Sequence, residues 1–415
     1  MTHLTRLALS TLFLFSLASS SWASEAEFDG YFRSGLGTNS KGGDQACFSN
    51  PGAGAHFRLG NECDEYGQLN MAFTFKSPQK EDPAVFNFNF MMAYSQSGQA
   101  NWEESPIAIR QAYVEGEHFF PGPTKIWAGK RFYRLEDLHI MDFAYRDFGP
   151  PGAGLQDIPI GGFKLAVAYL KGGGSTDTDI GPLAMTLYDV QLYDINAGFA
   201  GTLALWLAQA HQPGGNLTDS TENLTESVPV QGQALGLTSV HEFKKGYNQL
   251  SIQKGSGLMK DLRFMEETFD ISSAETLQQS QTLRIVEQFT WDQDLEWSMQ
   301  AAWIRERRQQ QPGRLDWQAI GGRFQLYLDH HWNLATEISQ SSVQDQAEGA
   351  PVRRLQKFTI APQLQLQPGF WERPVLRIFY TTAKWSQTNM GQVGGPAFAE
   401  ATDGSSFGFQ AELWF

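Results

Sequence analysis

The chain ends in Phe407-Gly-Phe-Gln-Ala-Glu-Leu-Trp-Phe415, and this stretch decides the class of fold. Its odd-numbered residues are apolar, whereas its even-numbered residues include Gln410 and Glu412. Successive side chains of a β-strand point to opposite faces, so the pattern predicts a strand with one apolar and one polar face. The same alternation recurs over residues 68–75, 295–304 and 358–367. The sequence therefore predicts an all-β protein.

The connections between these segments favour a membrane barrel over a soluble sandwich. Segments of about ten residues match tilted membrane strands, and short turns on one side of the membrane alternate with long outer loops. Asp329-His330 is a candidate short turn. Candidate long loops are Gly172–Ile180, Gln212–Glu226 and Ser386–Ser406. Paired aromatics at Phe119-Phe120 and Phe370-Trp371 suggest the rings that sit at the membrane surface.

The N-terminal residues 1–23 have the pattern of a secretory signal. Arg6 precedes an apolar stretch, Leu7–Ala18, and Ser21-Trp22-Ala23 is a small-x-small cleavage site. Residues 24–415 are then one barrel domain. A net charge of -14 without a basic cluster argues against a nucleic-acid partner.

Two cysteines, Cys47 and Cys63, lie in the exported part of the chain. An even count at short spacing in an oxidising compartment favours one disulfide, which would contribute about 3 kcal/mol. Two free thiols are the alternative. Two cysteines alone offer too few ligands for a metal site, so we expect neither a metal nor a cofactor.

Several ordered stretches resemble the maltoporin family of sugar-specific outer-membrane porins, while the region from about residue 172 to 242 matches poorly. The stretches are Phe28–Gly35, Arg58–Cys63, Ile126–Tyr133, Gly149–Gly154, Arg373–Phe379 and Leu413–Phe415. The resemblance implies an 18-stranded antiparallel transmembrane β-barrel whose third loop folds into the lumen. It also implies a homotrimer in the Gram-negative outer membrane, in contact with lipid and lipopolysaccharide. The expected function is facilitated diffusion of maltose and maltodextrins, with delivery to a periplasmic sugar-binding protein.

The family carries a slide of aromatic rings along which sugars move. The matching residues here are Tyr31, Tyr66, Trp102, Tyr247, Trp371 and Trp414. Trp414 falls on the polar face of the last strand, and Tyr66 and Tyr247 share the parity of nearby polar residues. Trp371 shares the parity of Arg377, although Pro374 intervenes, and Trp102 lies in a loop that the neighbouring subunit contributes in the family. A ring on a water-facing surface suits stacking on pyranose faces; a ring at the membrane surface is the alternative.

The family also carries a polar track that binds sugar hydroxyls. The matching residues are Arg33, Arg58, Gln68, Arg110, Asp137, His139 and Asp142. Guanidinium groups suit vicinal hydroxyls, although a wide polar lumen would hold arginines in any case. Gln68 stands where the family has a glutamate, so it accepts a hydrogen bond without charge-assisted strength.

The third loop departs most from the family. Leu135 stands where the family has an arginine, and Ala144 where it has a tyrosine at the narrowest point. Both changes shorten side chains, so we expect a wider or less discriminating pore, unless the adjacent Arg134 and Tyr145 take their places.

The sequence is also compatible with other functions. Within the same class, the channel could pass another oligosaccharide, such as sucrose or a β-glucoside, or be a nearly general pore. A barrel-based surface receptor and a secreted lectin belong to other classes, and aromatic rings on the lumen face argue against the receptor. Asp137 and His139 lack the third partner or nucleophile motif that catalysis needs, so an enzyme is not expected.

Overall fold

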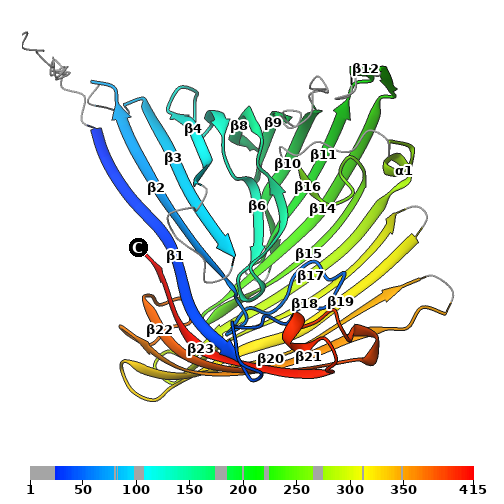
Figure 1. The fold of residues 1–415 in the computed structure, drawn as a ribbon. Coiled ribbons are helices and arrows are strands. Elements are labelled where there is room, and N and C mark those ends of the chain that lie inside the picture. Colours follow the sequence, from blue (N-terminus) through cyan, green and yellow to red (C-terminus); the bar gives the residue numbers. More distant parts are fainter. Residues whose placement is uncertain are drawn as a thin grey trace, which may run out of the picture.

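The computed structural model describes residues 24–78, 81, 83–97, 107–172, 185–198, 201–218, 224–264, 274–310, 313–346 and 349–415. The expected signal at residues 1–23 and Trp102 lie outside these ranges. Within them, an 18-stranded antiparallel sheet closes into one barrel, which confirms the predicted fold class (Figure 1).

Consecutive wall strands pair with one another, and the last strand closes the ring on the first. The wall consists of β1 (Ser24–Asn39), β2 (Asp64–Lys76), β3 (Val85–Ser97), β4 (Ile107–Glu117), β5 (Lys125–Lys130), β8 (Pro151–Ile160), β9 (Phe163–Gly172), β10 (Met185–Gly198), β11 (Gly201–Gln212), β14 (Val230–Phe243), β15 (Gly246–Gly257), β17 (Gln281–Asp292), β18 (Trp297–Gln310), β19 (Gly313–Tyr327), β20 (Trp332–Asp345), β21 (Arg353–Gln365), β22 (Val375–Trp385) and β23 (Asp403–Trp414). Tyr31 of β1 lies opposite Trp414 of β23 where the barrel closes. The closure leaves no unpaired edge in lipid, where each orphan polar group would be costly.

The alternation along β22 shows how the wall divides apolar from polar side chains. Leu376, Ile378 and Tyr380 point outward and are 56%, 53% and 47% exposed. Arg377 and Thr381, which have the opposite parity, point into the barrel and are 4% and 0% exposed. Period-two geometry therefore places the apolar face toward lipid and the polar face toward the lumen.

The connection from β5 to β8, residues 131–150 and here called loop 3, folds into the barrel as the resemblance implied. It forms β6 (Tyr133–Leu138), the 3-10 turn η2 (His139–Met141) and β7 (Phe143–Phe148). Strands β6 and β7 pair antiparallel, and β16 (Arg263–Phe264) adds to β7. Figure 1 shows β6 inside the ring of wall strands.

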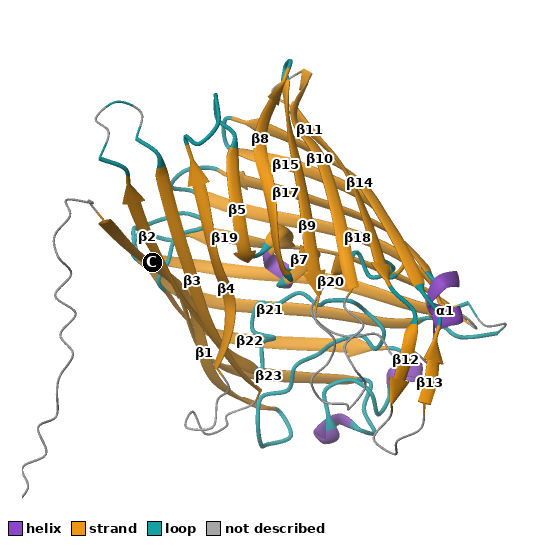
Figure 2. Ribbon diagram, turned by 90° about the horizontal axis from the view of Figure 1, so that it is seen from above, coloured by secondary structure: helices purple, strands orange, loops and turns teal. Residues whose placement is uncertain are grey.

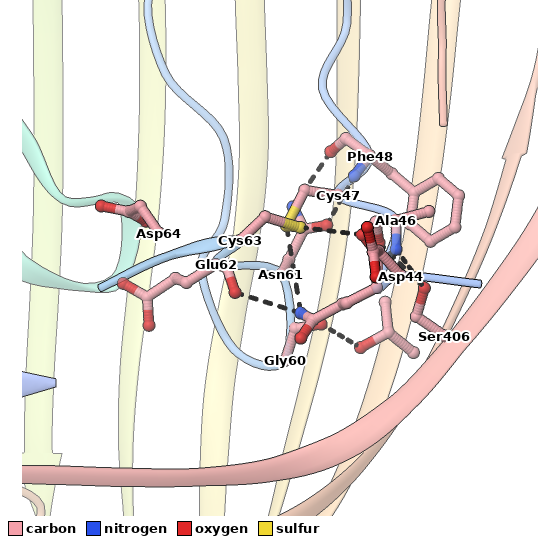
Figure 3. The surroundings of a disulfide bond; sticks show 12 residues. Asp44, Ala46, Cys47, Phe48, Gly60, Asn61, Glu62, Cys63, Asp64 and Ser406 are labelled. Carbon is pink, nitrogen blue, oxygen red and sulfur yellow. Dashed lines mark hydrogen bonds between the residues drawn. A yellow bond between two sulfur atoms is a disulfide. The ribbon is translucent and has the colours of Figure 1, made fainter. Parts of the chain in front are cut away.

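The connection from β1 to β2, residues 40–63 and here called loop 1, also turns inward. A disulfide joins Cys47 to Cys63 across a Cα–Cα distance of 5.9 Å, which confirms the predicted pairing (Figure 3). Beside the disulfide, the side-chain oxygen of Asn61 accepts a hydrogen bond from the backbone N–H of Phe48 at 2.7 Å. Further along, Thr359 of β21 donates to the carbonyl of Leu59 at 3.0 Å. Loop 1 is therefore closed on itself and bound to the wall.

The turn that carries Phe370 and Trp371, residues 366–374, folds inward as well. Phe119 and Phe120 are 45% and 41% exposed, in agreement with a position at the membrane surface. Phe370 is only 1% exposed and packs in the same core cluster as the buried residues of loop 3. The prediction of a surface ring at Phe370-Trp371 was therefore wrong, because this turn packs on the inside of the wall.

The other connections contain short elements. The predicted turn at Asp329-His330 joins β19 to β20, and the predicted loop Gln212–Glu226 contains a small hairpin. These elements are β12 (Gly215–Thr218), β13 (Leu224–Ser227), α1 (Ala274–Gln279), η4 (Gln387–Asn389) and η5 (Pro396–Phe398). None of the helices in the described ranges is long and apolar enough to cross a membrane. Seen from above, these connections lie round the ends of the strands (Figure 2).

Candidate functional site

A continuous row of aromatic rings follows the inside of the wall where the barrel closes. The centroids of Tyr66 and Tyr31 are 6.0 Å apart, those of Tyr31 and Trp414 6.3 Å, and those of Trp414 and Trp371 6.5 Å. The rings come from β2, β1, β23 and the 366–374 turn. Strand register explains the first three, because Tyr31 lies opposite Trp414 and next to the Arg33–Tyr66 pair. We call these four side chains the aromatic row.

Trp371 belongs to the row because of the fold of the 366–374 turn, and strand parity does not explain its position. It lies before β22, whose first residue is Val375, so no strand geometry orients it. The inward 366–374 turn places its ring 5.0 Å from His139 of loop 3, with the indole 40% exposed. His139 also lies 5.7 Å from Trp414. Loop 3 therefore meets the aromatic row at its Trp371 end.

One face of loop 3 carries all the residues predicted from it. Leu135, Asp137 and Asp142 are exposed, and His139 and Ala144 are partly exposed. Asp137 and Ala144 are cross-strand partners, so their side chains are neighbours on this face. The small Ala144 and the apolar Leu135 thus stand directly beside the acidic group.

Arg134 and Tyr145 have the opposite parity and point to the wall. Arg134 donates from Nε to Asp189 of β10 at 3.1 Å. Tyr145 is fully buried, and its hydroxyl accepts a hydrogen bond from Gln249 of β15 at 2.6 Å. Neither Arg134 nor Tyr145 takes the place of the longer side chain expected at position 135 or 144. A shift of either residue to the other face of loop 3 would break its contact with the wall.

Ion pairs tie loops 1 and 3 to the closing strands beside the aromatic row. Arg33 of β1 lies 2.6 Å from Asp142 of loop 3 and 2.8 Å from Glu62 of loop 1. Arg58 bridges Glu62 at 2.6 Å and Glu412 of β23 at 3.0 Å. Arg33 and Arg58 are only 6% and 4% exposed, whereas the Asp142 side chain is 56% exposed. The exposed acceptors of this network are therefore carboxylate oxygens held in place by buried guanidinium groups.

The two aspartates on the exposed face of loop 3 differ in the direction of their pKa shifts. The surrounding protein reduces the hydration of the Asp137 carboxyl, which raises its pKa above its ordinary value, and the charge of Asp142 adds to the rise. The same loss of hydration acts on Asp142, but the Arg58 and Arg33 guanidinium groups outweigh it and lower the pKa of Asp142. The environment therefore favours the charged form of one carboxyl and disfavours it for the other.

His139 is held in its neutral form. Burial lowers the pKa of His139 well below its ordinary value, and Arg58 lowers it further, against the opposing charge of Glu412. The geometry agrees, because Arg373 Nη2 lies 3.4 Å from His139 Nε2 and an arginine can only donate. His139 therefore presents an acceptor to Arg373.

The remaining predicted residues surround this centre. Gln68 accepts a hydrogen bond from the Tyr66 hydroxyl at 2.9 Å. Arg110 lies 5.1 Å from the ring centroid of Phe132, at the start of loop 3. Tyr247 lies on β15 opposite Thr290 and, within the described ranges, makes no ring contact with the aromatic row.

Sequence reasoning missed four charged residues of the site, which are Glu62, Glu412, Arg373 and Arg377. Arg373 and Arg377 both bind Glu412, at 2.9 and 2.6 Å. A signal was present for Glu412, because it shares the lumen parity of Trp414 two residues on. No signal was present for Arg373, whose position depends on the inward turn.

The chain is similar to one protein family and to several solved structures. The family model described as LamB porin matches residues 26–415. Similar solved structures include OmpT of Vibrio cholerae in a trimer form, with 8% identity, 95% of this chain and 100% of that chain covered, and a TM-score of 0.40. OccK2 (OpdF) of Pseudomonas aeruginosa has 11% identity, coverage of 94% and 98%, and a TM-score of 0.49. An anion-selective porin from Comamonas acidovorans has 9% identity, coverage of 94% and 100%, and a TM-score of 0.43.

Proposed function

The chain belongs to the LamB porin family, and from this membership we propose that it passes maltose and maltodextrins by facilitated diffusion along the aromatic row. Membership and the closed barrel locate it in the bacterial outer membrane, as a channel. We further propose a homotrimer, in contact with lipid and lipopolysaccharide, that delivers sugar to a periplasmic binding protein. The channel function involves no catalysis and no cofactor.

The observation that carries the proposal is the spacing of the aromatic row. Four rings with centroids 6.0 to 6.5 Å apart offer overlapping stacking positions to successive pyranose units. A sugar chain can then move from one ring to the next without leaving the row. Each contact is weak, which a channel requires, because a substrate must leave as readily as it enters. In the proposal, Trp102 and Tyr247 extend the row beyond these four rings.

Polar groups on both sides of the row are proposed to bind the sugar hydroxyls. The exposed carboxylate of Asp142, held by Arg33, provides acceptors, and Asp137 and His139 stand on the same face of loop 3. Arg58 contributes by fixing Glu62 and Glu412, while Gln68 and Arg110 complete the track near Tyr66. Charge-assisted hydrogen bonds of this kind add directionality to ring stacking.

A second substrate class has an observation in its favour. Leu135 and Ala144 face the passage, while Arg134 and Tyr145 are held against the wall. The constriction therefore lacks the arginine and the tyrosine of the family, which supports passage of bulkier or less strictly recognised oligosaccharides, such as sucrose or a β-glucoside.

Single-channel conductance in planar bilayers, titrated with maltotriose and then sucrose, tests the proposal. We expect saturable block by maltotriose at millimolar concentration or below, and its loss in Tyr66→Ala and Trp371→Ala. Tyr327→Phe is a matched control, because Tyr327 is a lumen-facing tyrosine of β19 outside the row. Block by sucrose alone would favour the second class. An open current unaffected by either sugar would indicate a general pore.

A further inference from the structure

Glu412 occupies a singular place beneath the aromatic row. It lies on β23 with the lumen parity of Trp414 and is 1% exposed. Its Oε1 accepts hydrogen bonds from the Tyr31 hydroxyl and is paired with Arg58, each at 3.0 Å. Its Oε2 is paired with Arg373 at 2.9 Å and Arg377 at 2.6 Å. One carboxylate thus meets three guanidinium groups and one phenol of the row.

Each partner of Glu412 leads to a ring of the aromatic row. The Tyr31 hydroxyl is held between Glu412 and Arg58, which fixes the direction of the phenol ring. The Arg373 guanidinium lies 4.1 Å from the ring centroid of Trp414. Arg373 also donates to the backbone carbonyls of Phe370 and Glu372, at 3.2 and 2.8 Å, on either side of Trp371. Three of the four rings therefore depend on groups bound to one carboxylate.

We propose that Glu412 is the positioning residue of the aromatic row, and that its negative charge holds Tyr31, Trp414 and Trp371 in the arrangement that sugars stack upon. This inference rests on the proposed function. Without that charge, Arg58, Arg373 and Arg377 would lie buried beside one another with no shared carboxylate, and their repulsion would displace the groups that orient the rings. A displaced row has to be reordered on binding, which weakens affinity even though every ring is still present.

A purely structural role is the alternative, and Glu337 of β20 offers a matched control for it. Glu337 is also 1% exposed and accepts from two cations, Arg323 and Lys357, each at 2.9 Å. Like Glu412 it binds loop 1, through the backbone N–H of Leu59. It contacts no ring of the aromatic row. Loss of its charge should therefore disturb stability to a similar degree without changing the row.

The test compares sugar block of Glu412→Gln and Glu337→Gln channels that show native heat-modifiable mobility on gels. We expect Glu412→Gln to raise the maltotriose dissociation constant by about tenfold, as for loss of one charge-assisted contact, mainly through faster dissociation in current-noise analysis. Glu337→Gln should stay within about twofold of the wild type. Tyr31→Phe keeps the ring and all charges but removes the tether, so it should weaken binding in the same direction and by less.

Each outcome decides the matter. Equal weakening by Glu412→Gln and Glu337→Gln would assign Glu412 a structural role and overturn the inference. So would wild-type affinity in both Glu412→Gln and Tyr31→Phe. If Glu412→Gln does not fold, Tyr31→Phe alone decides, since it alters no charge. Absence of block in the wild-type channel would instead defeat the proposed function, and this inference with it.

Discussion

The two sides of the barrel interior share one sequence pattern and differ in what covers them. On the side of β2 to β4, lumen-facing residues such as Asn70, Asn87 and Tyr113 remain partly exposed. On the side of β10 to β22, Gln300 and Gln363 also point into the barrel yet are fully buried. Alternation sends polar side chains inward on both sides. Whether they meet water depends on loops 1 and 3 and the 366–374 turn, which all pack on the second side.

On the covered side, loop 3 and the 366–374 turn pack against the wall and reach the aromatic row. Strand side chains there bind backbone groups of the loops: Thr381 donates to the carbonyl of Gly60 at 2.9 Å, and Arg284 to that of Tyr145 at 2.5 Å. Such bonds satisfy loop carbonyls that would otherwise be buried without partners. The polar face of the wall thus serves as a docking surface on one side and as a channel lining on the other.

The largest expected effect is a loss of stability when a buried ion pair on the covered side is removed. Glu337→Ala leaves Arg323 and Lys357 buried without their carboxylate, so we expect a loss of about 3–5 kcal/mol in the free energy of unfolding. Glu115→Ala, on the open side, removes partly exposed pairs with Lys125 and Arg131 and should lose about 1 kcal/mol or less. Urea unfolding of both variants in lipid vesicles measures the difference; similar losses would refute the division into two sides.

The disulfide tests how firmly loop 1 is held on the covered side. Replacing Cys47 and Cys63 by serine should reduce the free energy of unfolding by about 3 kcal/mol, because the loop between them gains freedom in the unfolded chain. We also expect noisier open-channel current, since loop 1 carries Arg58 to the aromatic row. Reduction of the wild-type protein is the control and should reproduce both changes. An unchanged unfolding curve would show that hydrogen bonds alone hold loop 1.

A third prediction concerns the width of the channel at the exposed face of loop 3. Ala144→Tyr adds a ring to the exposed face of loop 3 and should lower single-channel conductance severalfold, with tighter block by maltotriose. Tyr145→Phe changes the next residue, which faces the wall, and should leave conductance unchanged. Conductance at one salt concentration in planar bilayers distinguishes the two. Equal conductance in the wild type and Ala144→Tyr would mean that the narrowest point lies elsewhere.

The smallest expected effect concerns pH. The pKa of His139 lies well below its ordinary value and that of Asp142 below its own, so His139 is neutral and Asp142 is charged at neutral pH. Sugar affinity should therefore show no midpoint at the ordinary pKa of histidine, about 6.5. At lower pH, protonation of His139 places a cation beside Arg373, and protonation of Asp142 removes its pairing with Arg33. Both depressed pKa values then make stability fall with falling pH. A midpoint near pH 6.5 in the block titration would contradict this account.

The sequence by itself determined the wall. Alternation over residues 407–415 and its repeats predicted strands, and parity correctly turned Trp414 and Tyr66 inward, because side-chain direction in a strand follows from local covalent geometry. The spacing of Cys47 and Cys63 likewise favoured the bond that is present.

Only the tertiary structure decided which polar residues line water and which groups organise the site. The place of Trp371 beside His139, the burial of Phe370 and the gathering of three arginines on Glu412 depend on connections that pack against distant strands. The alternating sequence pattern does not predict such packing. A polar side chain fits the pattern equally well whether a loop or water covers that face of the strand. Local geometry therefore determined the barrel, and long-range packing determined the channel within it.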